Sequence, residues 1–146
     1  MRFLPVFLLW LFSSVGAYAQ QSAFEKTWFN AEKTSKIRIF KATDGAYYGK
    51  IVWLREPNGP DGKPRLDDKN PDAGKRKHTV MDMLILRGFT PHKDDPNVME
   101  GGKVYDPNNG KTYCGELTLK GNVISLKGYI CSLPFLSRTS NWTLAE

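Results

Sequence analysis

Residues 36–54 read KIRIFKATDGAYYGKIVWL, and this stretch decides the fold class. Polar and apolar residues alternate in its first four positions, which places Ile37 and Ile39 on one face of an extended strand. Residues 43–46 then form a turn, because their Asp-Gly pair tolerates the positive φ of a tight hairpin. Residues 47–54 are rich in β-branched and aromatic side chains and predict a second strand. We therefore expect a β-hairpin over the whole stretch.

A second hairpin is predicted around the Gly-Asn pair at 121–122. If this pair forms the turn, Leu117 lies opposite Leu126, and Leu119 lies opposite Ile124. The large apolar residues of both strands then share one face, as the register of a half-buried sheet requires.

The same register leaves the state of the two cysteines open. Cys114 faces Tyr129, and Cys131 is the diagonal neighbour of Cys114. Diagonal Cβ atoms lie about 7 Å apart, too far for a disulfide unless a bulge or a slip brings the sulfur atoms together. A pair of cysteines in an oxidising compartment favours a disulfide, while two free buried thiols and a Cys-His nucleophile remain as alternatives.

Short strand signals continue along the rest of the chain, without a convincing helix of three turns. They lie at 81–89, where a short helix is the alternative, and at 103–105, 111–120, 123–131 and 140–144. The segment 56–78 is rich in Gly, Pro, Asn and Asp and predicts a long polar loop. Seven or eight sequential strands form an antiparallel up-and-down meander, and closure into a barrel removes its edges. We predict an all-β fold, a closed barrel of about eight strands that can hold one small ligand.

The first nineteen residues predict export from the cytoplasm. Met1-Arg2 is a short positive start, residues 3–12 are apolar apart from Pro5, and Ala17-Tyr18-Ala19 carries small residues where signal peptidase reads them. The apolar stretch is much shorter than the ~20 residues of a membrane span, so a retained anchor is the weaker alternative. We expect a signal peptide over 1–19, cleaved near Ala19/Gln20. A single mature domain over 20–146 then lies in the periplasm or outside the cell, with no transmembrane segment.

The charge is mildly positive, with 21 Lys and Arg against 15 Asp and Glu and a net charge of +6 at pH 7. Outside the cytoplasm such an excess suits an anionic envelope surface, although an ordinary solvated surface carries it too. The basic run Lys75-Arg76-Lys77 would indicate nucleic acid only in an intracellular chain. We therefore expect no nucleic-acid partner.

Several motifs resemble a bacterial family of secreted proteins called domain of unknown function 2147 (DUF2147). Residues 47–54 (YYGKIVWL) are similar to its YxGKIVWL strand, and residues 101–113 (GGKVYDPNNGKTY) to its GGxIYDPxNGKTY segment. Further matches follow in the same order: Asp67, Asn70-Pro71-Asp72, Gly128-Tyr129-Ile130, Arg138-Thr139 and Trp142-Thr143. The departures are Met99 for tryptophan, Cys131 for glycine and Leu144 for arginine. The resemblance covers nearly the whole mature chain and implies a lipocalin-like barrel without an assigned activity.

Aromatic residues are the strongest candidates for ligand contacts, because they combine apolar area with a polar tip. The predicted ligand-binding residues are Tyr48, Trp53, Tyr105, Tyr113 and Trp142. The alternative is that these side chains fill a solid barrel. A polar rim at the barrel mouth is predicted from the polar residues of the family-like motifs, although turn formation also accounts for them. These residues are Asp67, Asn70, Asp72 and Asp106.

No catalytic residue, metal site or cofactor is predicted. Residues 106–110 are only a fragment of a calcium loop, since the third acidic or amide position and the bidentate glutamate are missing. His78 and His92 lie in loops beside lysines and are expected at the surface. The sequence contains no nucleophile elbow, paired zinc histidines or phosphate loop.

These observations support three functions in decreasing order. The first is a periplasmic or secreted protein that binds a small apolar or lipid-like ligand in the barrel, with the 56–78 loop near the mouth. The second is a structural or envelope-interaction module with a filled barrel. The third is a hydrolase, which requires the carboxylates of Asp67, Asp72 or Asp106 to converge in one cleft. A binding protein is therefore expected more than an enzyme.

Overall fold

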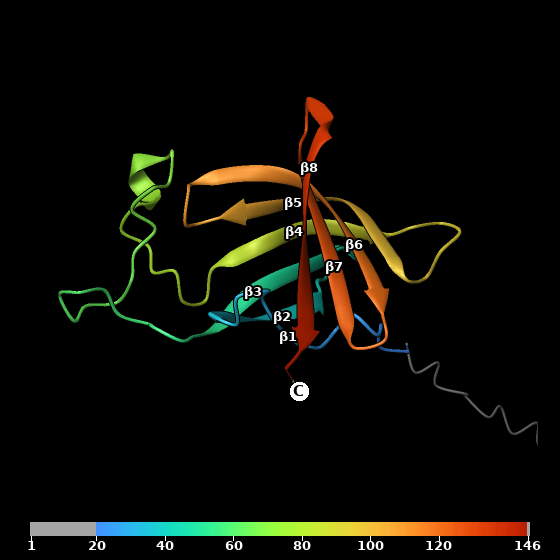
Figure 1. Ribbon diagram of the computed structural model, residues 1–146, viewed down its shortest axis with the longest axis horizontal. Helices are drawn as coiled ribbons and strands as arrows, with labels where there is room; N and C mark the ends of the chain where they lie inside the picture. The colour runs from blue at the N-terminus through green and yellow to red at the C-terminus, as the bar shows by residue number, and fades with distance from the viewer. Residues whose placement is uncertain (1–19, 146) are drawn as a thin grey trace, which may run out of the picture.

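The computed structural model describes residues 20–145, so the predicted signal peptide lies outside the described residues. Eight antiparallel strands follow one another along the chain: β1 (Thr27–Phe29), β2 (Ser35–Lys41), β3 (Tyr47–Leu54), β4 (Leu84–Pro91), β5 (Val98–Asp106), β6 (Lys111–Lys120), β7 (Val123–Ile130) and β8 (Leu133–Leu144). Each strand pairs with the next, and β8 pairs with β1, which closes the barrel (Figure 1). The predicted all-β up-and-down barrel is confirmed.

Both predicted hairpins are present, and the register predicted for the second one is confirmed. Arg38 pairs with Lys50 across β2 and β3, and Gly45 in the intervening turn has a φ of 84°. Leu117 pairs with Leu126 across β6 and β7. These registers follow from the turn positions, because a two-residue period allows only one alignment that buries both apolar faces.

The strand predicted at 81–89 begins later and ends later than expected, at Leu84 and Pro91. Asp82 has a φ of 65°, a left-handed conformation that extended strand residues do not adopt. The backbone therefore enters β4 only after this residue. The 56–78 segment lies in the long connection before it and contains one turn of 3-10 helix, η1 (Ala73–Lys75).

A bulge in β3 changes the face on which its last residues lie. Ile37 pairs with Ile51, whereas the preceding residue Lys36 pairs with Trp53, so Val52 is an extra residue on this strand. A bulge of this kind shifts the alternation of side chains by one position. Trp53 is consequently directed outward and is 38% exposed, although strict alternation predicts the same face as Ile51.

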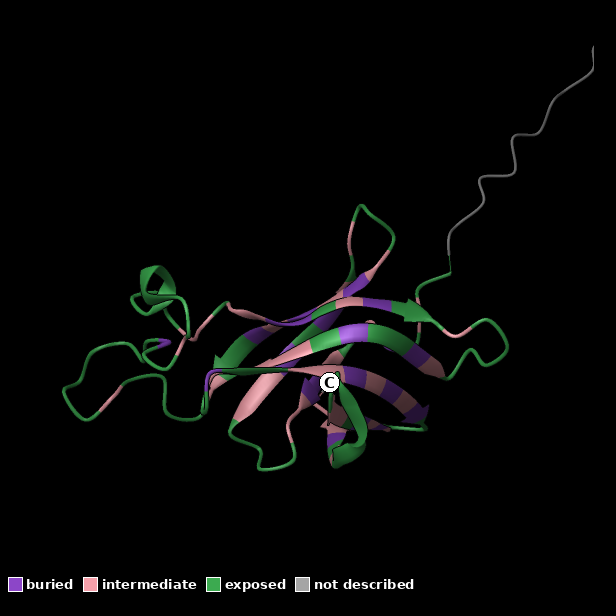
Figure 2. Ribbon diagram, turned by 90° about the horizontal axis from the view of Figure 1, so that it is seen from above, coloured by how far each residue is buried: buried purple, intermediate pink, exposed green. Residues whose placement is uncertain are grey.

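Large apolar side chains fill the end of the barrel that carries the β2–β3, β4–β5 and β6–β7 turns, here called the closed end. Buried bands alternate with accessible ones along the strands (Figure 2). The buried apolar residues come from all eight strands and from the segment before β1: Phe24, Trp28, Ile37, Ile39, Tyr47, Ile51, Ile85, Leu86, Phe89, Met99, Leu117, Leu119, Ile124, Leu126 and Trp142. The opposite end, here called the open end, carries the other four connections, including the long green one in Figure 1.

The two cysteines form a disulfide, with 5.1 Å between their Cα atoms. Cys114 pairs with Tyr129, as the predicted register requires. Cys131, however, lies in the β7–β8 turn rather than in the ladder, and the register shifts between Tyr129 and Ile130. Because of this shift, Cys131 is not held at the diagonal position of the regular ladder, where it would be too far from Cys114. A residue in the turn can approach the neighbouring strand more closely.

None of the helical segments in residues 20–145 combines the length and the apolar character needed to cross a bilayer.

Candidate ligand-binding site

A cavity of about 1670 Å³ occupies the open end of the barrel and is accessible from solvent. Its depth is lined by apolar side chains from six strands: Ile37, Ile51, Leu54, Ile85, Val104, Leu126 and Trp142. These residues continue the core of the closed end, so the cavity has an apolar floor. Sites for drug-sized ligands have volumes of about 300–1,000 Å³, and this lumen is larger than that range.

The mouth of the cavity is polar and is held by contacts between neighbouring loops. Arg55, at the end of β3, donates a hydrogen bond of 2.7 Å from Nη2 to the Lys33 carbonyl of the β1–β2 loop. Lys69 donates one of 2.7 Å from Nζ to the Asn108 carbonyl of the β5–β6 turn. Gly110 in that turn has a φ of 70°, and a Cβ atom there would collide with the Lys69 carbonyl. The long connection is therefore joined to the rim of the barrel.

Three of the five aromatic residues predicted to bind a ligand line this cavity: Tyr105, Tyr113 and Trp142. Trp142 is 4% exposed and contributes to the floor. Tyr113 lies nearer the mouth, where its hydroxyl oxygen accepts a 3.1 Å hydrogen bond from Asn109 Nδ2. The hydroxyl of Tyr105 extends to the long connection instead and bonds to Asp67.

Tyr48 lies outside the cavity, because it alternates with Tyr47 and Gly49, which are buried. Its ring stacks on Phe40 with 6.2 Å between centroids, and its hydroxyl donates a 2.7 Å hydrogen bond to Asp44 Oδ2. This bond lowers the pKa of Asp44 and raises the pKa of Tyr48. Tyr48 therefore takes part in the β2–β3 turn rather than in the candidate ligand site.

Trp53 is also outside the cavity, as a result of the Val52 bulge. Its ring meets Phe29 edge-on with 6.1 Å between centroids, and Lys36 Nζ lies 5.7 Å from the ring centre. These contacts cover the outer surface of β1, β2 and β3. The next residue, Leu54, returns to the interior and lines the cavity in its place.

Asp67 is a buried carboxylate, 2% exposed, with partners on both oxygens. Tyr105 Oη donates to Oδ1 at 2.6 Å, and Asn70 Nδ2 donates to Oδ2 at 2.6 Å. Burial raises the pKa of Tyr105 to about 12, and the hydrogen bond to Asp67 contributes to the rise. Because Tyr105 belongs to β5, this network fixes the long connection against the barrel wall.

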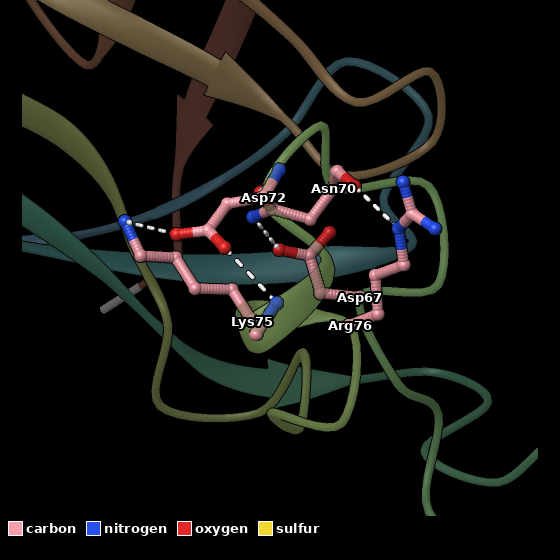
Figure 3. Close-up of polar contacts among 6 residues, drawn as sticks. Asp67, Asn70, Asp72, Lys75 and Arg76 are labelled. Carbon is pink, nitrogen blue, oxygen red and sulfur yellow. Dashed lines mark hydrogen bonds and ion pairs between the residues drawn. The ribbon is translucent and has the colours of Figure 1, made fainter.

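Asn70 and Asp72 stabilise the local backbone of the same connection (Figure 3). The Asn70 carbonyl accepts a 2.8 Å hydrogen bond from Arg76 Nε. Asp72 caps η1 by accepting from the Gly74 amide at 2.9 Å, and its other oxygen lies 3.6 Å from Lys75 Nζ. With Asp67, these residues line a separate cavity of about 330 Å³ on the outer face of β4 and β5. These three residues line this outer cavity, and the lining of the large cavity does not include them.

Asp106 does line the large cavity, but its carboxylate belongs to the β5–β6 turn. Oδ1 accepts a 2.9 Å hydrogen bond from the Asn108 amide, an Asx turn. Asp67, Asp72 and Asp106 therefore have separate partners. Within residues 20–145, no three His, Cys, Asp or Glu side chains are grouped as metal ligands would be.

The residues predicted from the sequence did not include the inward-facing residues of β8 before Trp142. The strand begins at Leu133 rather than near Ser140, and its alternation brings Ser140 and Arg138 to the cavity. Counting backward by two from Trp142 would identify both positions. The short Ser-rich segment with Pro134 masks this signal, because it has few of the residues that favour strands.

A closed barrel of eight antiparallel strands around an open lumen defines a lipocalin-like protein. A lipocalin-family protein from the human pathogen Helicobacter pylori has a similar structure, with a TM-score of 0.71 and 18% sequence identity; the match covers 86% of this chain and 84% of that one. The chain belongs to DUF2147, a family of uncharacterised proteins conserved in bacteria, whose sequence profile matches residues 26–144. The predicted family resemblance is thus confirmed. The search of curated proteins gave no match.

Proposed function

We propose that this protein binds one small apolar or lipid-like molecule in the lumen of its barrel and works in the periplasm or outside the cell. The observation that carries the proposal is the open cavity with an apolar floor and a polar mouth. A hydrocarbon chain gains about 0.8 kcal/mol for each methylene that it buries. The disulfide supports the location, since such bonds persist mainly in oxidising compartments.

The cavity weighs against a filled barrel, and the partners of the carboxylates weigh against a hydrolase. A structural module with a filled barrel would have side chains in the space that the cavity occupies. A hydrolase would need carboxylates that converge and are free to react, whereas both oxygens of Asp67 accept hydrogen bonds and Asp106 forms a turn. The geometry therefore favours binding without chemistry.

Native mass spectrometry of the mature protein from its own host, followed by organic extraction, tests the proposal directly. We expect an apolar molecule to co-purify. A fatty-acid titration that follows tryptophan fluorescence extends the test, with Trp142→Phe identifying the signal from the floor of the cavity. A clean mass without ligand and no fluorescence response to any fatty acid would overturn the proposal.

Gly128→Leu provides a variant that blocks the lumen. A Cβ atom at this position makes only ordinary van der Waals contacts, at 3.9 Å or more, and Gly128 lines the cavity, so a larger side chain there extends into the lumen. We expect fatty-acid binding to fall while the thermal unfolding temperature changes little. Thr118→Leu adds the same side chain to the outer face and should leave binding unchanged.

A further inference from the structure

Arg138 lies on the face of β8 that is directed into the lumen. It alternates with Ser140 and Trp142, and Trp142 pairs with Ile124, both of which are buried. Side chains two residues apart along a strand share a face. Arg138 also belongs to the lining of the large cavity. Arg138 therefore stands on the lumen face of β8, two positions nearer the mouth than Ser140 and four nearer than Trp142.

The Arg138 side chain has neither an ion pair nor a hydrogen bond with any residue in the described range 20–145. Its partner across β7 is Gly128, where an added Cβ would find Tyr113 Cβ at 3.9 Å as its nearest atom. Open space thus lies beside the arginine. The carboxylates that line the cavity are in the loops of the mouth, and none of them pairs with Arg138.

A second polar group borders the same space. The Tyr113 hydroxyl oxygen already accepts from Asn109, so its own proton is available to donate to a ligand. An arginine remains charged at every physiological pH and can give two parallel hydrogen bonds to a carboxylate or a phosphate. An arginine and a tyrosyl donor above an apolar floor match a molecule with an anionic head and a hydrocarbon tail.

We propose that the guanidinium of Arg138 binds the anionic headgroup, a carboxylate or a phosphate, of the molecule in the lumen. This inference rests on the proposed function, because it names the ligand class of the same cavity. The hydrocarbon tail extends toward Leu126 and Trp142. Tyr113 donates the additional hydrogen bond to the head.

The test compares three ligands with one tail: oleate, oleyl phosphate and oleyl alcohol. The wild-type protein should bind at least one anionic ligand about tenfold or more tightly than the alcohol, a difference typical of a charge-assisted pair. The preferred anion distinguishes a fatty acid from a phospholipid-like ligand. Arg138→Gln should bind all three with equal affinity, and Arg138→Lys should retain part of the preference. Arg38→Gln, on the outer face of β2, is the matched control and should behave as wild type.

The outcomes separate the two proposals. If none of the three ligands binds, the proposed function fails. If all three bind equally to the wild type, or if Arg138→Gln retains the anion preference, the lumen still binds apolar chains but Arg138 does not select the headgroup, and this inference is overturned.

A different observation concerns the tip of the β7–β8 hairpin, residues 130–136, which projects beyond the barrel in Figure 1. Phe135 is 79% exposed, and Ile130, Leu133 and Leu136 are between 42% and 48% exposed. Soluble proteins rarely expose several large apolar side chains side by side, so four of them within seven residues indicate an interaction site. The disulfide joins this tip to β6 and holds it in place.

The charge around the tip indicates its partner. The sequence contains no Asp or Glu between residues 117 and 145. Lys103 Nζ lies 3.3 Å from Cys131 Sγ, at the base of the tip. Apolar side chains flanked by cations favour an anionic lipid surface. Ile130 and Leu136 also line the cavity, so the tip borders the mouth of the lumen.

We infer that the 130–136 tip inserts into the surface of an anionic lipid bilayer. Co-sedimentation of the full mature chain with vesicles tests this inference. Vesicles of phosphatidylcholine with one-third phosphatidylglycerol should bind the protein, and pure phosphatidylcholine should bind it much less. Phe135→Ser should lower binding to the anionic vesicles about tenfold, since most of the exposed apolar area is lost. Val52→Ser removes an exposed apolar side chain elsewhere and should have no effect.

Equal vesicle binding by wild type and Phe135→Ser would overturn this second inference. The inference would also be overturned if the wild-type protein does not bind vesicles but forms dimers in analytical ultracentrifugation, and Phe135→Ser is monomeric. The tip would then be a contact between two copies of the chain. Neither outcome depends on whether the lumen holds a ligand.

Discussion

The same strands form a packed core at the closed end of the barrel and an open cavity at the other end. On β7 the inward positions read Ile124, Leu126 and Gly128 from the closed end to the open end. On β8 the matching positions read Trp142, Ser140 and Arg138. Large side chains exclude water at one end, whereas small and polar ones leave a cavity at the other. The same alternation of inward and outward residues therefore supports both packing and binding, because the size of each inward residue sets how much of the lumen is filled.

Removal of a large side chain from the closed end should have the largest effect on stability. Trp28 is fully buried, and its Nε1 donates a 3.0 Å hydrogen bond to the Phe24 carbonyl. Trp28→Ala should lower the free energy of unfolding by about 3–5 kcal/mol in a urea titration. Arg138→Ala at the open end should change it by less than about 0.5 kcal/mol. Equal losses at the two sites would contradict the division between a packed and an open end.

The disulfide at the open end should rank second. It closes a loop with a sequence separation of 17, for which loop entropy in the unfolded chain gives about 3 kcal/mol. The double variant Cys114→Ser, Cys131→Ser should lose about this amount in a urea titration, and reductant should produce the same loss in the wild type. A wild-type protein unaffected by reductant would show that the bridge does not limit stability.

The buried hydrogen bond between Tyr105 and Asp67 should contribute a smaller amount. Tyr105→Phe leaves one carboxylate oxygen of Asp67 without its donor and should cost about 1.5–3 kcal/mol at pH 8. Tyr113→Phe, whose hydroxyl contacts the exposed Asn109, is the control and should cost less.

The Tyr105 contribution should also depend on pH, with a known sign. The pKa of Tyr105 is raised from 10.0 to about 12, so the folded state holds this proton more tightly than the unfolded state. The contribution is complete below pH 10 and disappears as the pH rises from 10 toward 12. The difference in unfolding free energy between wild type and Tyr105→Phe should therefore shrink over that interval. If this difference stayed constant between pH 10 and pH 12, the Tyr105 proton would not be linked to folding.

Two glycines give the smallest and most direct test of the comparison. A Cβ atom on Gly115 would lie 2.6 Å from Val104 Cγ2 and 2.9 Å from Phe89 Cζ, whereas one on Gly128 has no neighbour closer than 3.9 Å. Gly115→Ala should destabilise the protein by about 1–3 kcal/mol through overpacking. Gly128→Ala should be neutral within about 0.5 kcal/mol. Gly115 and Gly128 are partners across β6 and β7, so the thermal unfolding temperatures of the two variants compare a filled and an open side of the lumen at one level. A lower temperature for Gly128→Ala than for Gly115→Ala would contradict this assignment.

The candidate site could be predicted only in part, and Trp53 illustrates the reason. Period-two alternation assigns it to the interior, but the extra residue Val52 reverses the face from that point. A bulge depends on how two strands align along their length, which the sequence of one strand does not reveal. Trp142 lies beyond such irregularities in its strand, and its prediction as a cavity-lining residue agrees with its position.

Asp67 illustrates a second limit. Its sequence context of turn-forming residues predicts a solvated loop position, and the prediction of a polar rim follows from that. The carboxylate is buried because Tyr105, 38 residues away in the sequence, reaches it from β5. Contacts over such separations depend on where the barrel places its strands.

The sequence alone determined the order of the strands, the position of both hairpins, the register of the hairpin around residues 121–122 and the family to which the chain belongs. Turn residues and a two-residue period act locally, so they can be interpreted from neighbouring positions. The tertiary structure alone decided which end of the lumen is empty, how the 56–78 segment joins the barrel and how Cys131 reaches Cys114. These features arise from the closure of eight strands around one axis, which brings together residues that no local pattern connects.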